Sequence, residues 1–178
     1  MLTLAISKGR LLTETLPLLA ACGCAPIENA EKSRALILPT ENPQVRLLIV
    51  RAQDAPTYVA CGVADAGVVG GDVIAETPSD DIYQPLTLPI GKCRLVVASR
   101  ADSVTGKTEK TDKKNKQQRQ ITVATKYVNL ARQYFNEQGI HCNIIKLYGS
   151  LELAPLVGMA DIIVDLAESG NTLQANGL

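Results

Sequence analysis

The closing stretch of the sequence, DIIVDLAESGNTLQANGL, joins two carboxylates to a turn of small polar residues. An apolar run leads to Asp165, and the polar residues that follow are Glu168, Ser169, Gly170, Asn171 and Thr172. Backbone N–H groups of such a turn, at the start of a helix, attract phosphate, and the serine and threonine hydroxyls add donors. Carboxylates would repel a phosphate, but they accept hydrogen bonds from a neighbouring diol. The stretch therefore indicates a sugar-phosphate site, with a capped helix after a strand as the alternative.

Cationic side chains follow two apolar runs nearer the start of the chain. Lys8 and Arg10 come after the first run, and Arg51 comes after the run that ends at Val50. Ligands of open α/β folds bind outside the carboxyl ends of the strands. The three cations are thus predicted to neutralise a polyphosphate, unless they belong to ordinary solvated turns.

Two further stretches are weaker candidates for anion contacts. Gly70 and Gly71 follow another buried run and precede Asp72, and a glycine pair allows a ligand to approach the backbone closely. Lys92 and Arg94 could reach a bound anion from the middle of the chain. The alternatives are a plain tight turn and ordinary surface charges.

Other chemistries lack the residues they need. The single histidine, His141, leaves no Ser-His-Asp constellation, and we interpret it and the adjoining Cys142 as structural. No GxGxxG follows the first apolar run, and Gly106-Lys107-Thr108 lacks the earlier glycine of a phosphate-binding P-loop. Cys22 and Cys24 form the only close cysteine pair, which is a weak signal for zinc. No metal ligand is assigned from the protein.

Composition narrows the class of protein. Lysine and arginine (18) balance aspartate and glutamate (18) within 178 residues, which argues against a nucleic-acid binder. The N-terminus lacks the pattern of a signal peptide, and no apolar run approaches the roughly 18 residues of a membrane span. The cysteines are odd in number (5) and stand mostly in apolar surroundings, which favours reduced thiols. We therefore predict a cytoplasmic protein without nucleic-acid or membrane partners.

The elements that must position these residues alternate between short apolar runs and helix-like stretches. Strands are predicted at residues 3–6, 46–50, 66–69, 82–88, 94–99, 121–124, 143–147 and 161–164. Helices are predicted from Leu11, after the caps Asp54, Asp72 and Ser150, and over residues 129–138. This order predicts an α/β protein with mostly parallel sheets covered on both faces. Residues 101–120, polar and rich in lysine, are predicted to form a surface loop, and no internal repeat is evident.

Together these motifs resemble the short form of ATP phosphoribosyltransferase, a family of histidine-biosynthesis enzymes. The likeness is carried by ISKGR, by RAQDAPTYVACGVADAGVVGGD from Arg51 to Asp72, by GKCRLVVA from Gly91, by ATKYVNLARQYF from Ala124 and by the closing stretch. It spans nearly the whole chain apart from residues 101–120, where members usually carry a more apolar, ordered segment. Members also continue beyond ANGL with a stretch that returns to the first domain.

The resemblance implies a fold and a reaction. The fold would be that of type II periplasmic binding proteins, with two α/β domains, residues 1–91 and 92–171, and a cleft between them. Family members return to the first domain after about residues 172–178. The reaction would join ATP and phosphoribosyl pyrophosphate (PRPP), with Mg²⁺, to give N1-phosphoribosyl-ATP and pyrophosphate. Adenine N1 is itself the nucleophile, so no covalent enzyme intermediate is required, and no general base is assigned.

The resemblance also implies roles for the residues singled out above. Asp165 and Glu168 would lie near the ribose hydroxyls of PRPP, and residues 169–172 would cradle its 5-phosphate. Lys8, Arg10 and Arg51 would contact polyphosphate, with Arg51 foremost at the leaving pyrophosphate. Gly70, Gly71, Asp72, Lys92 and Arg94 would make weaker contacts with ATP or polyphosphate.

The resemblance extends to partners. Short-form members work with a separate regulatory subunit that resembles histidyl-tRNA synthetase, in a hetero-octamer, and we expect the same here, with a homodimer of the catalytic chain. Histidine would then inhibit through that partner. Two alternatives stay open: another PRPP-dependent transferase with a different base acceptor, and a non-catalytic ligand-binding module with the same bilobal fold.

Overall fold

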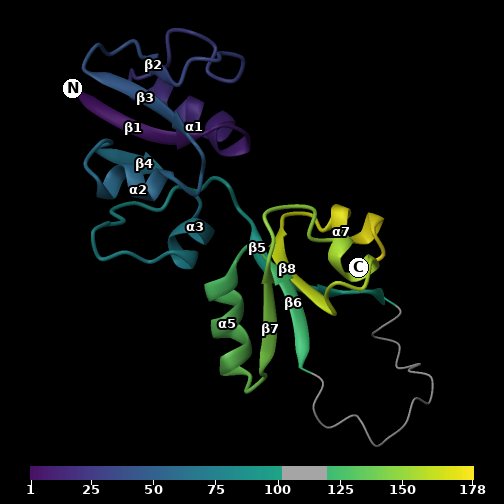
Figure 1. Ribbon diagram of the computed structural model, residues 1–178. Coiled ribbons are helices and arrows are strands. Elements are labelled where there is room, and N and C mark those ends of the chain that lie inside the picture. Colours follow the sequence, from purple (N-terminus) through teal and green to yellow (C-terminus); the bar gives the residue numbers. More distant parts are fainter. Residues whose placement is uncertain (102–119) are drawn as a thin grey trace, which may run out of the picture. The chain divides into compact units, whose positions relative to one another are not determined.

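The computed structural model describes residues 1–101 and 120–178, and the chain divides into two compact units, Met1–Lys92 and Cys93–Leu178. Each unit is built on a four-stranded sheet (Figure 1). The predicted loop at residues 101–120 lies, apart from its two ends, outside the described residues. Within the described ranges, no helix has the length and hydrophobicity needed to cross a bilayer.

The sheet of the first unit has β1 (Leu2–Ser7) near its centre. β1 pairs in parallel with β3 (Val45–Val50) and with β4 (Ala66–Val68), while β2 (Ile37–Pro39) runs antiparallel to β3. The strand order is β2-β3-β1-β4. The helices are α1 (Arg10–Ala21), α2 (Ala55–Ala60) and α3 (Gly71–Glu76).

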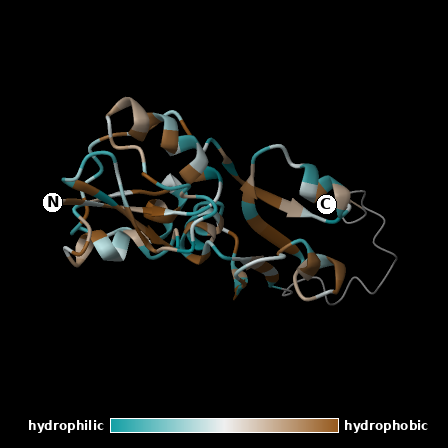
Figure 2. Cartoon of the chain, turned by 90° about the horizontal axis from the view of Figure 1, so that it is seen from above, coloured by the Kyte–Doolittle hydropathy of each residue, from teal (hydrophilic) through white to brown (hydrophobic). Residues whose placement is uncertain are grey.

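Both faces of this first sheet are covered. Ile6 of β1 packs in a buried cluster with Leu12 of α1 and Leu47 of β3. Its neighbour Ala5 points to the opposite face, because side chains alternate along a strand, and packs with Ala55 of α2. The strands are accordingly hydrophobic almost throughout (Figure 2), as expected for a parallel sheet between helices.

The sheet of the second unit has β6 (Ile121–Thr125) in the equivalent place. β6 pairs in parallel with β7 (Cys142–Lys146) and β8 (Ile162–Ala167), and β5 (Arg94–Ser99) runs antiparallel to β8. The strand order is β5-β8-β6-β7, and the described helices are α5 (Val128–Glu137), α6 (Leu153–Leu156) and α7 (Asn171–Ala175). The two mixed, mostly parallel sheets confirm the predicted α/β class.

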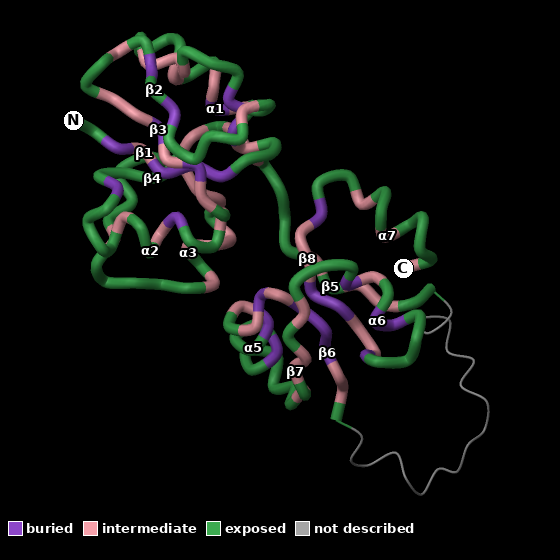
Figure 3. The backbone as a smooth tube through the Cα atoms, turned by 45° about the horizontal axis from the view of Figure 1, so that its top comes forward, coloured by how far each residue is buried: buried purple, intermediate pink, exposed green. Residues whose placement is uncertain are grey.

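The second core is again two-sided. Val123 of β6 packs with Ala131 and Phe135 of α5 on one face. Ala124 packs with Leu151 and Ala154 on the other. Burial is therefore concentrated in the central strands, up to their last residues Ser7 and Thr125, and in the helix residues that pack on them (Figure 3). The residues that follow these strands, Lys8 and Lys126, are more exposed.

The two units share one arrangement of their parallel strands, although the sequence shows no repeat. In the described residues of each, three parallel strands are each followed by a helix, and the first of these strands lies between the other two. The antiparallel strand differs in place, because β2 lies beside the second of the three in the first unit and β5 lies beside the third in the second unit. In the first unit the Thr3 N–H donates to Asp65 Oδ2 at 2.7 Å, and the Asp65 N–H donates to the Thr3 carbonyl at 2.9 Å. Thr122 and Asp161 make the same reciprocal pair in the second unit, at 2.8 and 2.9 Å.

Two predictions about strands are wrong. Residues 82–88 form neither helix nor strand, and Pro85 in their midst cannot donate a ladder hydrogen bond. The final strand does not end at Val164 but continues through Asp165 to Ala167, because this part pairs with β5. The short strand β2 was not predicted.

The predicted helix caps are also wrong. Asp54 precedes α2 without a capping hydrogen bond from its side chain. Helix α3 already begins at Gly71, so Asp72 lies in its first turn. Ser150 has a φ of 50° and is separated from α6, whose N-terminal flanking residue is Glu152.

The predicted surroundings of the cysteines need correction as well. All five are free thiols, as expected, but none is fully buried: Cys22, Cys61 and Cys93 are exposed, and Cys24 and Cys142 are half-buried. Apolar neighbours in the sequence therefore did not indicate apolar surroundings in the fold.

Candidate active site

The predicted sugar-phosphate loop surrounds a cavity at the carboxyl end of β8. The cavity has a volume of about 200 Å³ and is lined by Glu152, Asp165, Leu166, Ala167, Glu168, Ser169, Gly170, Asn171, Thr172 and Leu173. All of the residues predicted from the closing motif thus line a single hollow. This location agrees with the rule that ligands of α/β sheets bind beyond the carboxyl ends of the strands.

The turn at the end of this loop depends on a glycine. Gly170 has a φ of 79°, in the left-handed region that L side chains rarely adopt, and it directly precedes α7. Ser169 Oγ accepts a hydrogen bond from the Asn171 N–H at 3.4 Å. Leu173 packs against the core cluster that contains Ala124. The turn is therefore attached to the core on one side while its polar residues line the cavity.

Asp165 is half-buried in this cavity. Burial raises the pKa of its carboxyl above the usual value, and the Glu152 carboxylate adds to the increase. The Leu166 N–H, which donates to Asp165 Oδ1 at 2.8 Å, and the ammonium group of Lys126 oppose it. A partly desolvated carboxylate is a strong hydrogen-bond acceptor, because solvent competes less for it.

Two residues of this neighbourhood were missed by the sequence analysis. Lys126 directly follows β6, and because Thr125 pairs with Val164, the next residues, Lys126 and Asp165, are neighbours. The Lys126 ammonium also lies 4.7 Å from the centre of the Tyr127 ring. Lys126 follows an apolar run just as Lys8 does, so the same strand-end rule could have found it. Nothing in the sequence marks Glu152, whose proximity to Asp165 is purely tertiary.

The first unit gathers its predicted cations at the corresponding edge. Ser7 pairs with Val50, so the residues that follow, Lys8 and Arg51, leave adjacent parallel strands side by side. β4 ends on the other side of β1, and Gly70 follows it there. Lys8 and Arg51 are exposed, so a ligand can reach both.

The cations differ in how they are held. Lys8 Nζ donates to the Ser33 carbonyl, which places the exposed Arg34 next to this edge as a further cation that sequence analysis missed. Arg10 opens α1 and forms an ion pair with Glu14, with 2.9 Å between Nε and Oε1. In the described part of the chain, the guanidinium of Arg51 has neither a hydrogen-bond nor an ion-pair partner.

The weaker candidates for anion contacts differ in how accessible they are to a phosphate. A Cβ at Gly70 would collide with the carboxylate of Asp72, so this acid covers Gly70, but not Gly71, and would repel a phosphate there. Arg94 opens β5 and pairs with Ala167, which places it beside the loop that lines the cavity. Lys92 is exposed at the end of the first unit.

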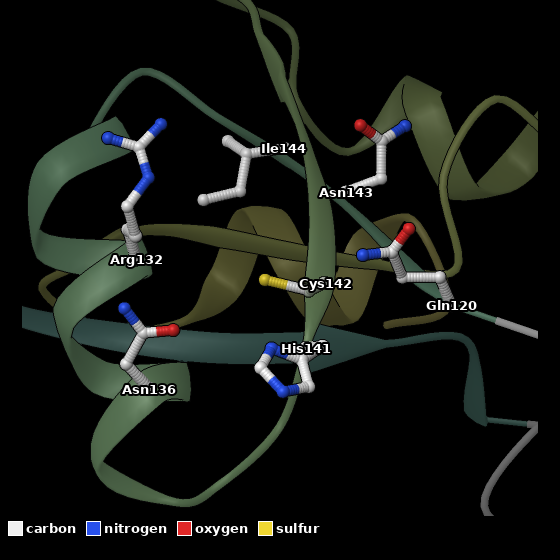
Figure 4. A pocket seen from close by; sticks show the side chains of 7 residues that line it. All are labelled: Gln120, Arg132, Asn136, His141, Cys142, Asn143 and Ile144. Carbon is white, nitrogen blue, oxygen red and sulfur yellow. The ribbon is translucent and has the colours of Figure 1, made fainter.

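A second hollow, of about 330 Å³, lies between α5 and β7 (Figure 4). It is lined by Gln120, Arg132, Asn136, His141, Cys142, Asn143 and Ile144. Cys142 points toward α5, and burial raises the pKa of its thiol while the Arg132 charge opposes the increase, which disfavours a nucleophilic thiolate. The hollow lies at the amino end of β7, where α/β sheets rarely bind substrates. Across the described ranges, no group of three or more Asp, Glu, His or Cys side chains could hold a metal ion.

Comparison with known proteins decides the family. Residues 51–178 match the family model described as HisG, ATP phosphoribosyltransferase. The chain is 55% identical over its full length to the ATP phosphoribosyltransferase of Ectopseudomonas mendocina, of which it covers 79%. It is 54% identical to that of Albidiferax ferrireducens, of which it covers 81%. The chain belongs to the ATP phosphoribosyltransferase family.

A solved structure agrees with this assignment. The chain resembles a chain of the ATP phosphoribosyl transferase (HisG:HisZ) complex from Thermotoga maritima, with a TM-score of 0.77 and 34% identity over 99% of this chain and 79% of that one. The expected two-unit α/β fold of the family is thus confirmed. Of the three functions left open by the sequence, the comparisons select ATP phosphoribosyltransferase, a pentosyltransferase that performs the first step of histidine biosynthesis.

Proposed function

We propose that PRPP binds with its 5-phosphate in the cavity formed by residues 165–173. The supporting observation is the combination, in one hollow, of the left-handed Gly170 turn, the hydroxyls of Ser169 and Thr172, and adjacent carboxylates. A glycine at this position leaves open space where any other residue would place a Cβ. Phosphate oxygens can therefore approach the backbone N–H groups of the turn closely.

The ribose of PRPP would lie against the acidic part of the same cavity. Asp165 and Glu168 line it, and Glu152 adds a third carboxylate. Each ionised carboxylate accepts hydrogen bonds, and the two ribose hydroxyls supply donors. Phosphate and diol are thus recognised by opposite kinds of group, which fixes the orientation of the sugar.

The cations of the first unit would act on the pyrophosphate. In the reaction, a bond forms between adenine N1 of ATP and the anomeric carbon of PRPP, while the bond from that carbon to the pyrophosphate oxygen breaks and its electron pair leaves with pyrophosphate. Lys8, Arg10 and Arg51 would stabilise the negative charge that develops on the departing pyrophosphate in the transition state more than they stabilise bound PRPP. Because described residues leave the Arg51 guanidinium without a partner, we assign it the leading role.

Mg²⁺ is proposed as the metal that accompanies the pyrophosphate. This ion is usually held by one or two carboxylates together with substrate phosphates, and Asp165 and Glu152 supply donors of that kind to the cavity. When bound, Mg²⁺ would add positive charge on the pyrophosphate oxygens.

Contacts with ATP are assigned to the remaining candidates. Arg94, beside the loop, and Lys92 would contact the triphosphate. Gly70 and Gly71 allow a close approach, but the Asp72 carboxylate over Gly70 suits a hydroxyl or a hydrated cation better than a phosphate.

We further propose that the chain assembles with a regulatory subunit of the HisZ type, and with a second catalytic chain, in a hetero-octamer. The resemblance to a chain of the HisG:HisZ complex supports this assembly. Inhibition by histidine would act through the regulatory subunit. If histidine inhibited the isolated catalytic chain as strongly as the assembly with the regulatory subunit, this route of inhibition would be contradicted.

The decisive experiment combines this chain with ATP, PRPP and Mg²⁺ and follows the absorbance of phosphoribosyl-ATP, with and without the regulatory subunit. We expect product formation that requires ATP. Pyrophosphate release with another base acceptor instead of ATP would contradict the acceptor, and tight PRPP binding without turnover in either assembly would contradict the catalytic role.

A further inference from the structure

One carboxylate of the first unit connects a proposed substrate-binding arginine to the end of that unit. Glu14 Oε1 lies 2.9 Å from Arg10 Nε, and Glu14 Oε2 accepts a hydrogen bond from the Gly91 N–H at 2.6 Å. Arg10 Nη2 in turn donates to the Lys92 carbonyl at 3.0 Å. The two side chains of α1 and the backbone of residues 91–92 therefore form a closed ring of polar contacts.

The backbone at this place is specialised for the contact. Gly91 has a φ of 62°, and a Cβ built on it would lie only 3.3 Å from Leu11 Cδ1. The segment thus passes close against α1 in a conformation that favours glycine. A hydrogen bond from a backbone N–H to an ionised carboxylate is stronger than one between neutral groups. Residues 91–92 are also the last of the first unit, so the ring secures the point where the chain leaves it.

The ring has little value as a stabilising ion pair. The side chains of Arg10 and Glu14 are 40% and 35% exposed, and exposed pairs contribute little to the free energy of unfolding. Its effect is geometric instead, because an arginine side chain free in solvent samples many rotamers, and contacts on both Nε and Nη2 restrict them. Arg10 is also the first residue of α1, only two positions beyond Lys8.

We propose that Glu14 is a positioning residue for the transfer reaction, which orients the Arg10 guanidinium toward the polyphosphate of the substrate. The inference rests on the proposed function, in which Arg10 contacts that polyphosphate. Glu14 itself touches no substrate. It acts through Arg10, so its removal matters only while Arg10 is present.

A double-mutant cycle tests this dependence. Glu14→Gln keeps the length of the side chain and an acceptor for the Gly91 N–H, but loses the charge that holds Arg10. We expect kcat to fall about fivefold, roughly the net contribution of one typical hydrogen bond, with KM for PRPP changed less than about twofold. Combined with Arg10→Ala, Glu14→Gln should lower kcat by no more than about 1.5-fold beyond Arg10→Ala alone.

A matched control separates positioning from charge and folding. Glu41→Gln makes the same change of charge at an exposed position of the first unit and should leave kcat unchanged. Thermal unfolding of every variant reports folding independently. If Glu14→Gln lowers kcat by the same factor with and without Arg10, or if Glu14→Gln alone leaves kcat unchanged, the inference is wrong while the proposed function stands. If Arg10→Ala alone leaves turnover unchanged, the proposed role of Arg10 fails first.

Discussion

The proposed phosphate site at residues 169–172, called here the phosphate cradle, can be tested through the backbone of Gly170 alone. This residue has a φ of 79°, and nothing lies within 4 Å of the place a Cβ would occupy. Gly170→Ala therefore adds no steric clash within the chain, only the cost of a left-handed conformation, which is about 1–2 kcal/mol for an L residue. Without ligand, the loop of this variant avoids that cost by changing to a conformation other than the left-handed turn.

The cost translates directly into affinity. If PRPP binds only to the left-handed turn, a penalty of 1–2 kcal/mol weakens binding about 5- to 30-fold. Gly170→Asn should weaken it less, because asparagine adopts this region more readily than alanine, and Gly170→Val should weaken it most, because a branched side chain is a strong outlier there. Calorimetric titration of the full chain with PRPP measures each dissociation constant.

Gly139→Ala provides the matched control. Gly139 has a φ of 68°, has similarly open space within 4 Å of where its Cβ would stand, and lies between α5 and β7, away from the loop. The substitution should lower the melting temperature by about 2–8 °C, as expected for a penalty of this size in a chain of this length, and leave PRPP binding unchanged. Equal PRPP affinity in Gly170→Ala and wild type, or equal weakening in both variants, would refute the cradle.

Three further outcomes follow from the site. Arg51→Ala should lower kcat about 100-fold while raising KM for PRPP only a few-fold, because its charge is proposed to act on the leaving group; steady-state kinetics check this, and a change confined to KM would contradict it. Asp165→Asn should abolish detectable PRPP binding yet raise thermal stability at neutral pH. The pKa of Asp165 is raised in the folded state, so ionisation of this carboxyl disfavours folding. The wild type therefore loses stability as the pH rises from the pKa of Asp165 in the unfolded chain toward its pKa in the folded chain. Melting temperatures measured across this pH range should fall in the wild type, and this fall should be absent in the variant. Lys126→Met should shift the acidic limb of kcat/KM for PRPP to higher pH, because the Lys126 charge lowers the pKa of Asp165; an unshifted limb would exclude this coupling.

The sequence predicted the fold class well because apolar runs and helical stretches alternate clearly. It failed where a tertiary partner decides. Strand β8 continues past Val164 because Leu166 and Ala167 pair with β5, and no local pattern announces that pairing. Residues 82–88 show the converse, since a strand-like composition with a proline inside it found no partner strand.

The candidate site was predictable to the extent that its residues stand together in the chain. The closing motif placed Asp165 and its followers in one cavity, because they follow one another around a single turn. Glu152 reaches that cavity from a different connection, and only the fold brings it there. Asp72 is the instructive failure: its type suits a helix cap, but its carboxylate lies over Gly70 instead.

The reciprocal pairs of Thr3 with Asp65 and of Thr122 with Asp161 separate the stabilising end of each sheet from the end with the candidate site. They fasten neighbouring parallel strands at their amino ends, away from the proposed substrate contacts. The opposite rims can then crowd together groups that repel one another, such as Lys8 with Arg51 or Asp165 with Glu152, without the strands splaying apart. Mutations at the two ends of the sheets should accordingly have different effects. Loss of Asp65 or Asp161 would lower the stability of a whole unit, whereas changes at the carboxyl ends of the strands would alter the reaction and leave the fold intact.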